Sequence, residues 1–190
     1  ANPLTIANPN GSELKDLIAA PGSNPNTLRT LKVTGKMTTK DWNYVMSSMP
    51  QLEMFDISET TVTTIPEQAL RDKDHLTTLH LPSTVTTIEN SAFFSCDLLT
   101  TVDGCEKVKE IGSSAFGYCY KLANFPFGNE IRSIESDAFT YCTSLPETLV
   151  MPASLTTLGW GNVFNYSSIL NFDLSQCTLN GQFAYNTFGQ

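Results

Sequence analysis

Apolar residues recur along the chain in an order that repeats about every 23 residues. Each unit opens with alternating apolar and polar residues, a pattern that predicts a strand with one buried face. A second apolar pair follows roughly ten residues later and predicts a short helix or a second strand. The opening pattern is clear at Leu28, Leu31 and Val33, at Leu52, Phe55 and Ile57, and at Leu76, Leu79 and Leu81.

The repeat is almost literal between His75 and Thr143, where the chain runs HLTTLHLPSTVTTIENSAFFSCD, LLTTVDGCEKVKEIGSSAFGYCY and KLANFPFGNEIRSIESDAFTYCT. Such self-similarity is typical of a solenoid, because one unit cannot bury its apolar face without stacking on its neighbours. We count about seven units of 22–25 residues from Thr27 to Gln190. The predicted fold is α/β, a right-handed leucine-rich-repeat solenoid, or horseshoe, with a parallel concave sheet.

The segment before the first repeat has a different pattern. Residues 1–26 are predicted to form an N-terminal helical cap, because the first unit of a solenoid must hide the edge of its core. Ser12 is expected to cap a short amphipathic helix. The apolar positions of that helix are Leu14, Leu17 and Ile18. Residues 27–190 then form the solenoid, so that the chain is one structural domain.

A second helix is predicted over residues 41–48, with Thr38 and Asp41 as a capping box. Its inward-facing side chains are expected to be Trp42, Val45 and Met46. At the other end, Phe183 and Phe188 occupy repeat positions without an evident polar cap. Either these rings seal the end, or the chain is truncated there, or a second copy packs against it as a weak dimer.

Composition narrows the classes of partner. The 190 residues carry a formal charge of −8, and their 11 Lys and Arg are scattered. Nucleic-acid binding needs a basic stripe that neutralises phosphates, so no nucleic-acid partner is expected. No segment approaches the roughly 20 apolar residues of a membrane helix, so membrane insertion is not expected. The opening ANPLTIANPN has no signal core, which fits a cytosolic or an already processed chain.

Three of the five cysteines, Cys96, Cys119 and Cys142, occupy the same position in consecutive units. Stacked units hold such side chains parallel, so we expect a column of buried free thiols rather than disulfides. Cys105 and Cys177 lie about three units apart, too far for a bond. No metal site is predicted, because there is no Cys-x-x-Cys pair and no histidine beside the thiols. No cofactor is expected.

The repeated apolar pair followed by Ala-Phe, two residues, Cys, two residues and Leu resembles the BspA-like, or treponemal-type, leucine-rich repeat of bacterial surface proteins. The resemblance covers Leu76 to Leu145 strongly. It weakens where Leu70 replaces the Phe and where Tyr166 and Ser167 stand at the cysteine position. It implies an extracellular or outer-surface bacterial protein that binds host matrix proteins, cell-surface proteins or glycans. It carries no catalytic residues.

One polar patch on the predicted concave face is a candidate binding site. The middle column of the strands is Lys32, Asp56, His80, Asp103, Pro126, Val150 and Asp173. Asp56, His80 and Asp103 fall on consecutive rungs about 5 Å apart. Their expected neighbours on the same face are Met54, Thr78, Thr101 and Asn124. The patch is predicted to bind a basic side chain or a sugar; the alternative is an ordinary solvated surface.

A second candidate is aromatic. Tyr118, Tyr141 and Tyr166 precede the cysteine position in consecutive units. Stacked rings on one flank are expected either to form a platform for sugars or to pack on one another and shield the turns. The sequence leaves both alternatives open.

The first functional hypothesis is therefore a non-enzymatic, secreted or cell-surface adhesion module that recognises protein ligands through the concave face. The alternatives are a lectin-like module that uses the tyrosines and a structural spacer. An enzyme is not expected, because stacked repeats give an open surface and not a cleft that gathers a nucleophile and a base.

Overall fold

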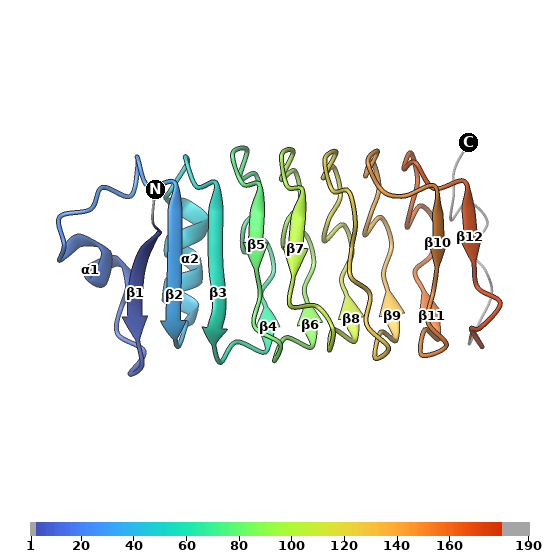
Figure 1. Cartoon of the computed structure of the whole chain (residues 1–190), viewed down its shortest axis with the longest axis horizontal. Coiled ribbons are helices and arrows are strands. Elements are labelled where there is room, and N and C mark those ends of the chain that lie inside the picture. The colour runs from blue at the N-terminus through green and yellow to red at the C-terminus, as the bar shows by residue number, and fades with distance from the viewer. Residues whose placement is uncertain (1–2, 180–190) are drawn as a thin grey trace.

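The computed structural model describes residues 3–179, which wind into a stack of similar turns (Figure 1). The opening strands of the first four units, together with a preceding strand β1, form one parallel sheet in the order β1, β2, β3, β5, β7. Leu31, Phe55 and Leu79, which occupy the same position on three neighbouring strands, are fully buried. The predicted solenoid with a parallel sheet is confirmed. Its strands are β1 Leu4–Asn8, β2 Thr30–Gly35, β3 Met54–Thr60, β5 Thr78–His80 and β7 Thr101–Asp103.

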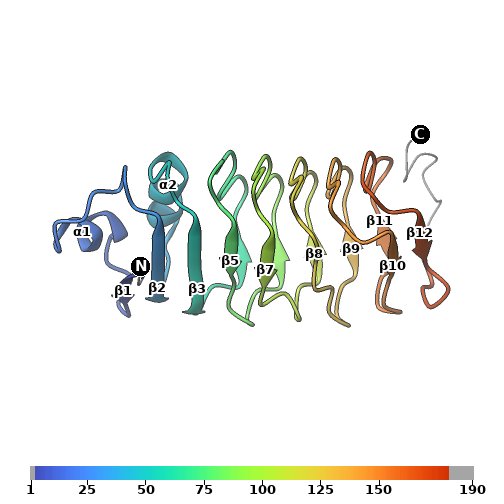
Figure 2. The ribbon, with the colours of Figure 1, turned by 45° about the horizontal axis from the view of Figure 1, so that its top comes forward.

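In the second to sixth units, the second apolar pair forms a short strand and not a helix. These strands make a second parallel sheet in the order β11, β9, β8, β6, β4. They are β4 Thr64–Ile65, β6 Thr87–Ile88, β8 Glu110–Ile111, β9 Ser133–Ile134 and β11 Thr157–Leu158. In both views the turns follow one another in an almost straight row, so the face predicted to be concave is an open sheet surface (Figure 2).

The first sheet is interrupted after β7. In the next unit, residues 121–127 form no strand, although Leu122 and Phe125 are buried at the expected positions. Pro126 has no N–H to donate, and the Phe127 N–H turns back to the Phe125 carbonyl at 2.9 Å. Pairing resumes only in a separate parallel pair, β10 Thr148–Val150 and β12 Asn171–Asp173.

A column of stacked phenylalanines runs through the core. Phe93, Phe116, Phe139 and Phe164 are 0 to 1% exposed, and successive ring centroids lie 5.0, 5.3 and 5.4 Å apart. The rings of the last two pairs are nearly parallel, at 5° and 10°. The repeat period therefore places one large ring on the next, and burial plus ring contact stabilises each step of the stack.

The predicted column of free thiols is confirmed. Cys96, Cys119 and Cys142 are fully buried, and all five cysteines of the chain are free. The thiol of Cys119 donates to the Phe93 carbonyl at 3.2 Å, and Cys142 donates to the Phe116 carbonyl at 3.1 Å. Each thiol thus ties its unit to the one before it. In the preceding unit, Lys73 stands at the same position and its ammonium donates to the Ser48 carbonyl at 2.5 Å.

Alkaline pH is expected to weaken this column. Burial raises the pKa of the Cys96 thiol from 9.0 to about 12, and burial also raises the pKa of Cys119 and Cys142. A folded-state pKa above the unfolded value stabilises the fold below pH 9, and that stability is lost as pH rises from about 9 toward 12. The free energy of urea unfolding should therefore fall between pH 7.5 and 10.5, and it should fall less steeply in Cys96→Ala. Equal slopes in the two proteins would contradict this role of the thiol.

The parallel sheet begins before the first repeat. β1 pairs with β2 over five residues, from Leu4 opposite Leu31 to Asn8 opposite Gly35. The predicted short helix follows as α1 Leu14–Ala19, with Leu14 and Ile18 fully buried. The second predicted helix is α2 Thr39–Ser47, and its capping box between Thr38 and Asp41 is confirmed.

Two details of these helices differ from the prediction. Ser12 does not cap α1; instead, the Leu14 N–H donates to the Asp41 carboxylate at 2.7 Å, so one buried side chain caps both helices. Met46 is 37% exposed, because the inward stripe of α2 is formed by Trp42 and Val45. The predictions for Phe183, Phe188 and the C-terminal end lie outside the described residues.

Candidate functional site

Four strands of the first sheet carry the predicted polar patch. Lys32 on β2 pairs in register with Asp56 on β3, Asp56 with His80 on β5, and His80 with Asp103 on β7. We call the outward-facing side of β2, β3, β5 and β7 the charged face. Because the strands hold the backbone in register, the side chains of this column project side by side from a rigid surface.

His80 is bonded to one of its two acidic neighbours. Its Nδ1 lies 2.8 Å from Oδ2 of Asp103, in a hydrogen bond between the neighbouring strands β5 and β7. The His80 side chain is 32% exposed and that of Asp103 is 54% exposed. Within residues 3–179, Nε2 of His80 has no protein partner. The carboxylate thus orients the imidazole and leaves its second nitrogen available to a ligand.

The other acidic neighbour, Asp56, is held by its own strand and by β2. Its Oδ1 accepts from the Ser58 N–H at 2.9 Å and from the Ser58 hydroxyl at 2.6 Å, and Lys32 Nζ lies 3.6 Å from Oδ2. Burial opposes the charge of Asp56, but the Ser58 bonds together with Lys32 and His80 outweigh it and lower the pKa of this carboxyl. Asp56 is therefore ionised at neutral pH, and Lys32 also pairs with Glu59.

A second outward column runs beside the charged one. Met54, Thr78 and Thr101 pair in register across β3, β5 and β7. The predicted fourth member, Asn124, is exposed but lies in the unpaired segment after β7, so it does not continue the sheet. Sequence reasoning also missed an ion pair at the strand entrances, where Arg29 contacts Glu53 at 2.5 Å. The sequence did contain a signal for this pair, because Arg29 and Glu53 occupy the same position in consecutive units.

The chemistry of the charged face suits binding. It offers oriented carboxylates, a histidine nitrogen and hydroxyls on a stiff support, which are groups that donate and accept hydrogen bonds to a partner. In the described part of the chain, no three His, Cys, Asp or Glu side chains are grouped as a metal site. Across residues 3–179, no helix is long and apolar enough to cross a membrane.

The rings of the three tyrosines proposed as a platform are stacked on one another in the structure. Tyr118 and Tyr141 have ring centroids 4.7 Å apart, and Tyr141 and Tyr166 are 4.6 Å apart. Each has a positive φ, between 54° and 63°, which is uncommon for a bulky residue. The bond from the Tyr118 N–H to the Thr140 carbonyl at 2.8 Å helps hold that conformation. Phe94 extends the column, with its ring 5.2 Å from that of Tyr118.

We call Phe94, Tyr118, Tyr141 and Tyr166 the aromatic strip. The rings of the three tyrosines cover one another's faces, while Tyr166 at the end of the strip is 51% exposed. This contact stabilises the turns, at about 0.5–1.5 kcal/mol for each pair. The sugar platform stays a prediction.

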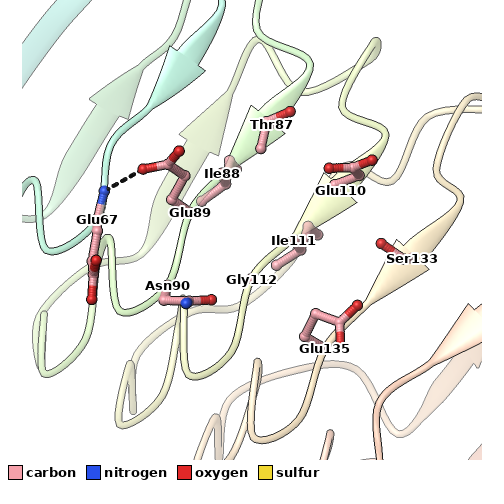
Figure 3. A pocket seen from close by; sticks show the side chains of 10 residues that line it. All are labelled: Glu67, Thr87, Ile88, Glu89, Asn90, Glu110, Ile111, Gly112, Ser133 and Glu135. Atoms are coloured by element: carbon pink, nitrogen blue, oxygen red, sulfur yellow. Dashed lines mark hydrogen bonds between the residues drawn. The ribbon is translucent and has the colours of Figure 1, made fainter.

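An acidic groove on the second sheet was not predicted. It encloses about 410 Å³, and glutamates from four units line it (Figure 3). The carboxylate of Glu89 accepts from the Glu67 N–H at 2.9 Å, and Glu110 and Glu135 belong to the next two units. No lysine or arginine is among the described residues that line it. Recurrence of glutamate beside the second apolar pair was the signal for this column.

Comparison with solved structures supports the fold. A leucine-rich repeat protein from Bacteroides ovatus is 26% identical with a TM-score of 0.55; the match covers 63% of this chain and 30% of that one. The leucine-rich repeat protein of T. pallidum is 27% identical with a TM-score of 0.55, over 61% of this chain and 55% of that one. This chain thus matches only part of the length of either relative.

The search of the curated proteins found no match. The profile of the BspA type leucine rich repeat region, in contrast, matches residues 63–188 in six copies. These copies include the units whose phenylalanines and thiols form the columns of the core. The chain belongs to the BspA-type leucine-rich repeat family.

Proposed function

We propose that this chain is a non-enzymatic binding module, secreted or displayed on the bacterial surface, that recognises a protein partner through the charged face. The observation that carries the proposal is the aligned row of Asp56, His80 and Asp103 on three paired strands. Rigid strands reduce the entropy lost when such side chains meet a partner. The family resemblance supports the surface location and the adhesion role.

The chemistry of this row favours a partner that brings a hydrogen-bond donor or a basic side chain. Asp103 keeps one carboxylate oxygen outside its bond to His80, and Nε2 of His80 is directed to no other residue among those described. Met54, Thr78 and Thr101 add one thioether and two hydroxyls beside the row. The face therefore combines charged anchors with small polar contacts, as the rims and anchors of protein interfaces do.

A binding screen tests the proposal. The purified chain is applied to immobilised extracellular-matrix proteins and, in parallel, to a glycan array. We expect a protein hit whose affinity falls at least about tenfold in the double variant Asp56→Ala/Asp103→Ala, because centrally placed interface residues often contribute 2 kcal/mol or more.

The matched control is Glu67→Ala/Glu110→Ala, which removes the same charge from the acidic groove and should leave the affinity unchanged. Melting temperatures show whether each variant is folded. A protein hit that is equally strong in both double variants would place the interface elsewhere. A screen without any protein hit would favour the spacer function.

A further inference from the structure

The side of the solenoid that carries the aromatic strip, which we call the flank, has aspartates at its N-terminal end. Asp72 occupies the position of Tyr118 two units earlier, and Asp74 and Asp97 occupy the position of Tyr120 in the two preceding units. The charges of Asp74 and Asp72 add to burial in raising the pKa of the Asp97 carboxyl. Equivalent positions of consecutive units stack about 5 Å apart, so Asp74 and Asp97 are neighbours, and Asp72 completes a group of three carboxylates at the N-terminal end of the strip. We call them the acidic end.

The acidic end adjoins the rings directly. Arg71 lies 4.8 Å from the centroid of Phe94, the first ring of the strip, and its Nε is 3.3 Å from Asp72. Burial, followed by the charge of Asp97, raises the pKa of the Tyr120 phenol. The Tyr120 ring is nearly perpendicular to Tyr118, at 6.1 Å and 80°. The flank is thus one continuous surface that is aromatic toward the C-terminal units. Toward the N-terminal units it carries three carboxylates and one cation, Arg71, so that negative charge is in excess there.

The spacing of the rings matches one kind of partner. The two steps from Tyr118 to Tyr141 and from Tyr141 to Tyr166 measure 4.7 and 4.6 Å. Two such steps equal the length of one turn of a polyproline II helix, about 9.3 Å from three residues at 3.1 Å each. Aromatic side chains are the usual contact for proline-rich segments, which lose little entropy on binding because they are already extended.

We propose that this flank is a second interaction surface, separate from the charged face, and that it binds a proline-rich segment with basic residues at one end. The prolines lie along the edges of the stacked rings of the aromatic strip, and the basic residues meet Asp72, Asp74 and Asp97. Charge complementarity fixes the direction of the bound segment, because among residues 3–179 the acidic group lies at the N-terminal end of the strip.

Fluorescence anisotropy with synthetic peptides tests this proposal. The probe is a labelled peptide of two arginines followed by nine prolines. One control replaces the prolines with alternating glycine and serine, and another replaces the arginines with glutamates. We expect both controls to bind about tenfold more weakly or worse, because the first loses the preformed extended shape and the second reverses the charge.

Protein variants locate the site. Tyr141→Leu keeps an apolar side chain in the stack and should weaken the arginine–proline peptide about tenfold. Asp97→Asn keeps the shape and should weaken it about threefold, with a smaller dependence on salt. Asp56→Ala/Asp103→Ala should bind the peptide as the unmodified chain does. The peptide experiment can therefore fail or succeed independently of the proposed protein binding by the charged face.

Three results would overturn the proposal. The first is equal affinity for the proline and glycine–serine peptides. The second is unchanged peptide affinity in a folded Tyr141→Leu protein. The third is a glycan hit that Tyr141→Leu abolishes while no proline peptide binds, which would assign the strip to sugars.

Discussion

Replacing Phe116 with alanine should lower the free energy of unfolding by about 3–5 kcal/mol, because it leaves a ring-sized cavity in the core. The ring is fully buried between Phe93 and Phe139 and also meets the edge of Phe125 at 5.1 Å. The substitution therefore removes contacts to three rings in the middle of the stack. Urea denaturation followed by circular dichroism measures the loss.

Phe116→Leu is the matched control. Leucine occupies this column naturally at Leu70, which is fully buried. The control should cost clearly less than the alanine variant, because most of the buried volume is retained. A loss below about 1 kcal/mol in Phe116→Ala would mean that the neighbouring units collapse around the gap and that the ring column is not a main source of stability.

Gly104→Ala is expected to have the second large effect, a loss of more than about 3 kcal/mol together with weaker binding at the charged face. Gly104 follows Asp103 at the end of β7 and has a φ of +80°. A Cβ at this position would lie 2.0 Å from the Leu81 carbonyl oxygen, so the backbone of one of the two units must move. Such a shift would separate Asp103 from His80.

Gly22→Ala separates the cost of the left-handed backbone from the cost of the close contact with Leu81. Gly22 has a similar φ of +76°, but an added Cβ would meet nothing within 4 Å. This control should lose only the roughly 1–2 kcal/mol that a left-handed conformation costs a side chain. Thermal melts of both variants make the comparison. Equal losses would show that the close contact with Leu81 is relieved at no cost.

The period of the sequence made the register of the charged face predictable. Asp56, His80 and Asp103 occupy one position in consecutive units, and stacking places equivalent positions side by side. The partner of His80 was harder to predict, because a carboxylate lies on each side of it. The structure resolves the choice: Lys32 and Ser58 satisfy Asp56, and His80 bonds Asp103.

Other features left weaker signals in the sequence. β1 lies outside the repeats, and the alternation of Leu4, Thr5 and Ile6 is too short to stand out as a strand. The interruption after β7 was visible as Pro126 in the strand column, but the buried Leu122 and Phe125 preserved the apolar pattern around it. The bonds from the thiols to the preceding carbonyls depend on the exact offset between units, which spacing alone does not specify.

The most direct test of the charged face is carboxyl footprinting of the complex with the captured protein partner. Carbodiimide labelling followed by mass spectrometry reports the accessibility of each exposed carboxylate. We expect the partner to protect Asp103 on β7 and Glu53, which directly precedes β3, and to leave Glu110 and Glu135 in the acidic groove labelled as in the free chain. Protection of the second-sheet glutamates, with Asp103 unchanged, would contradict the account and place the partner in the acidic groove.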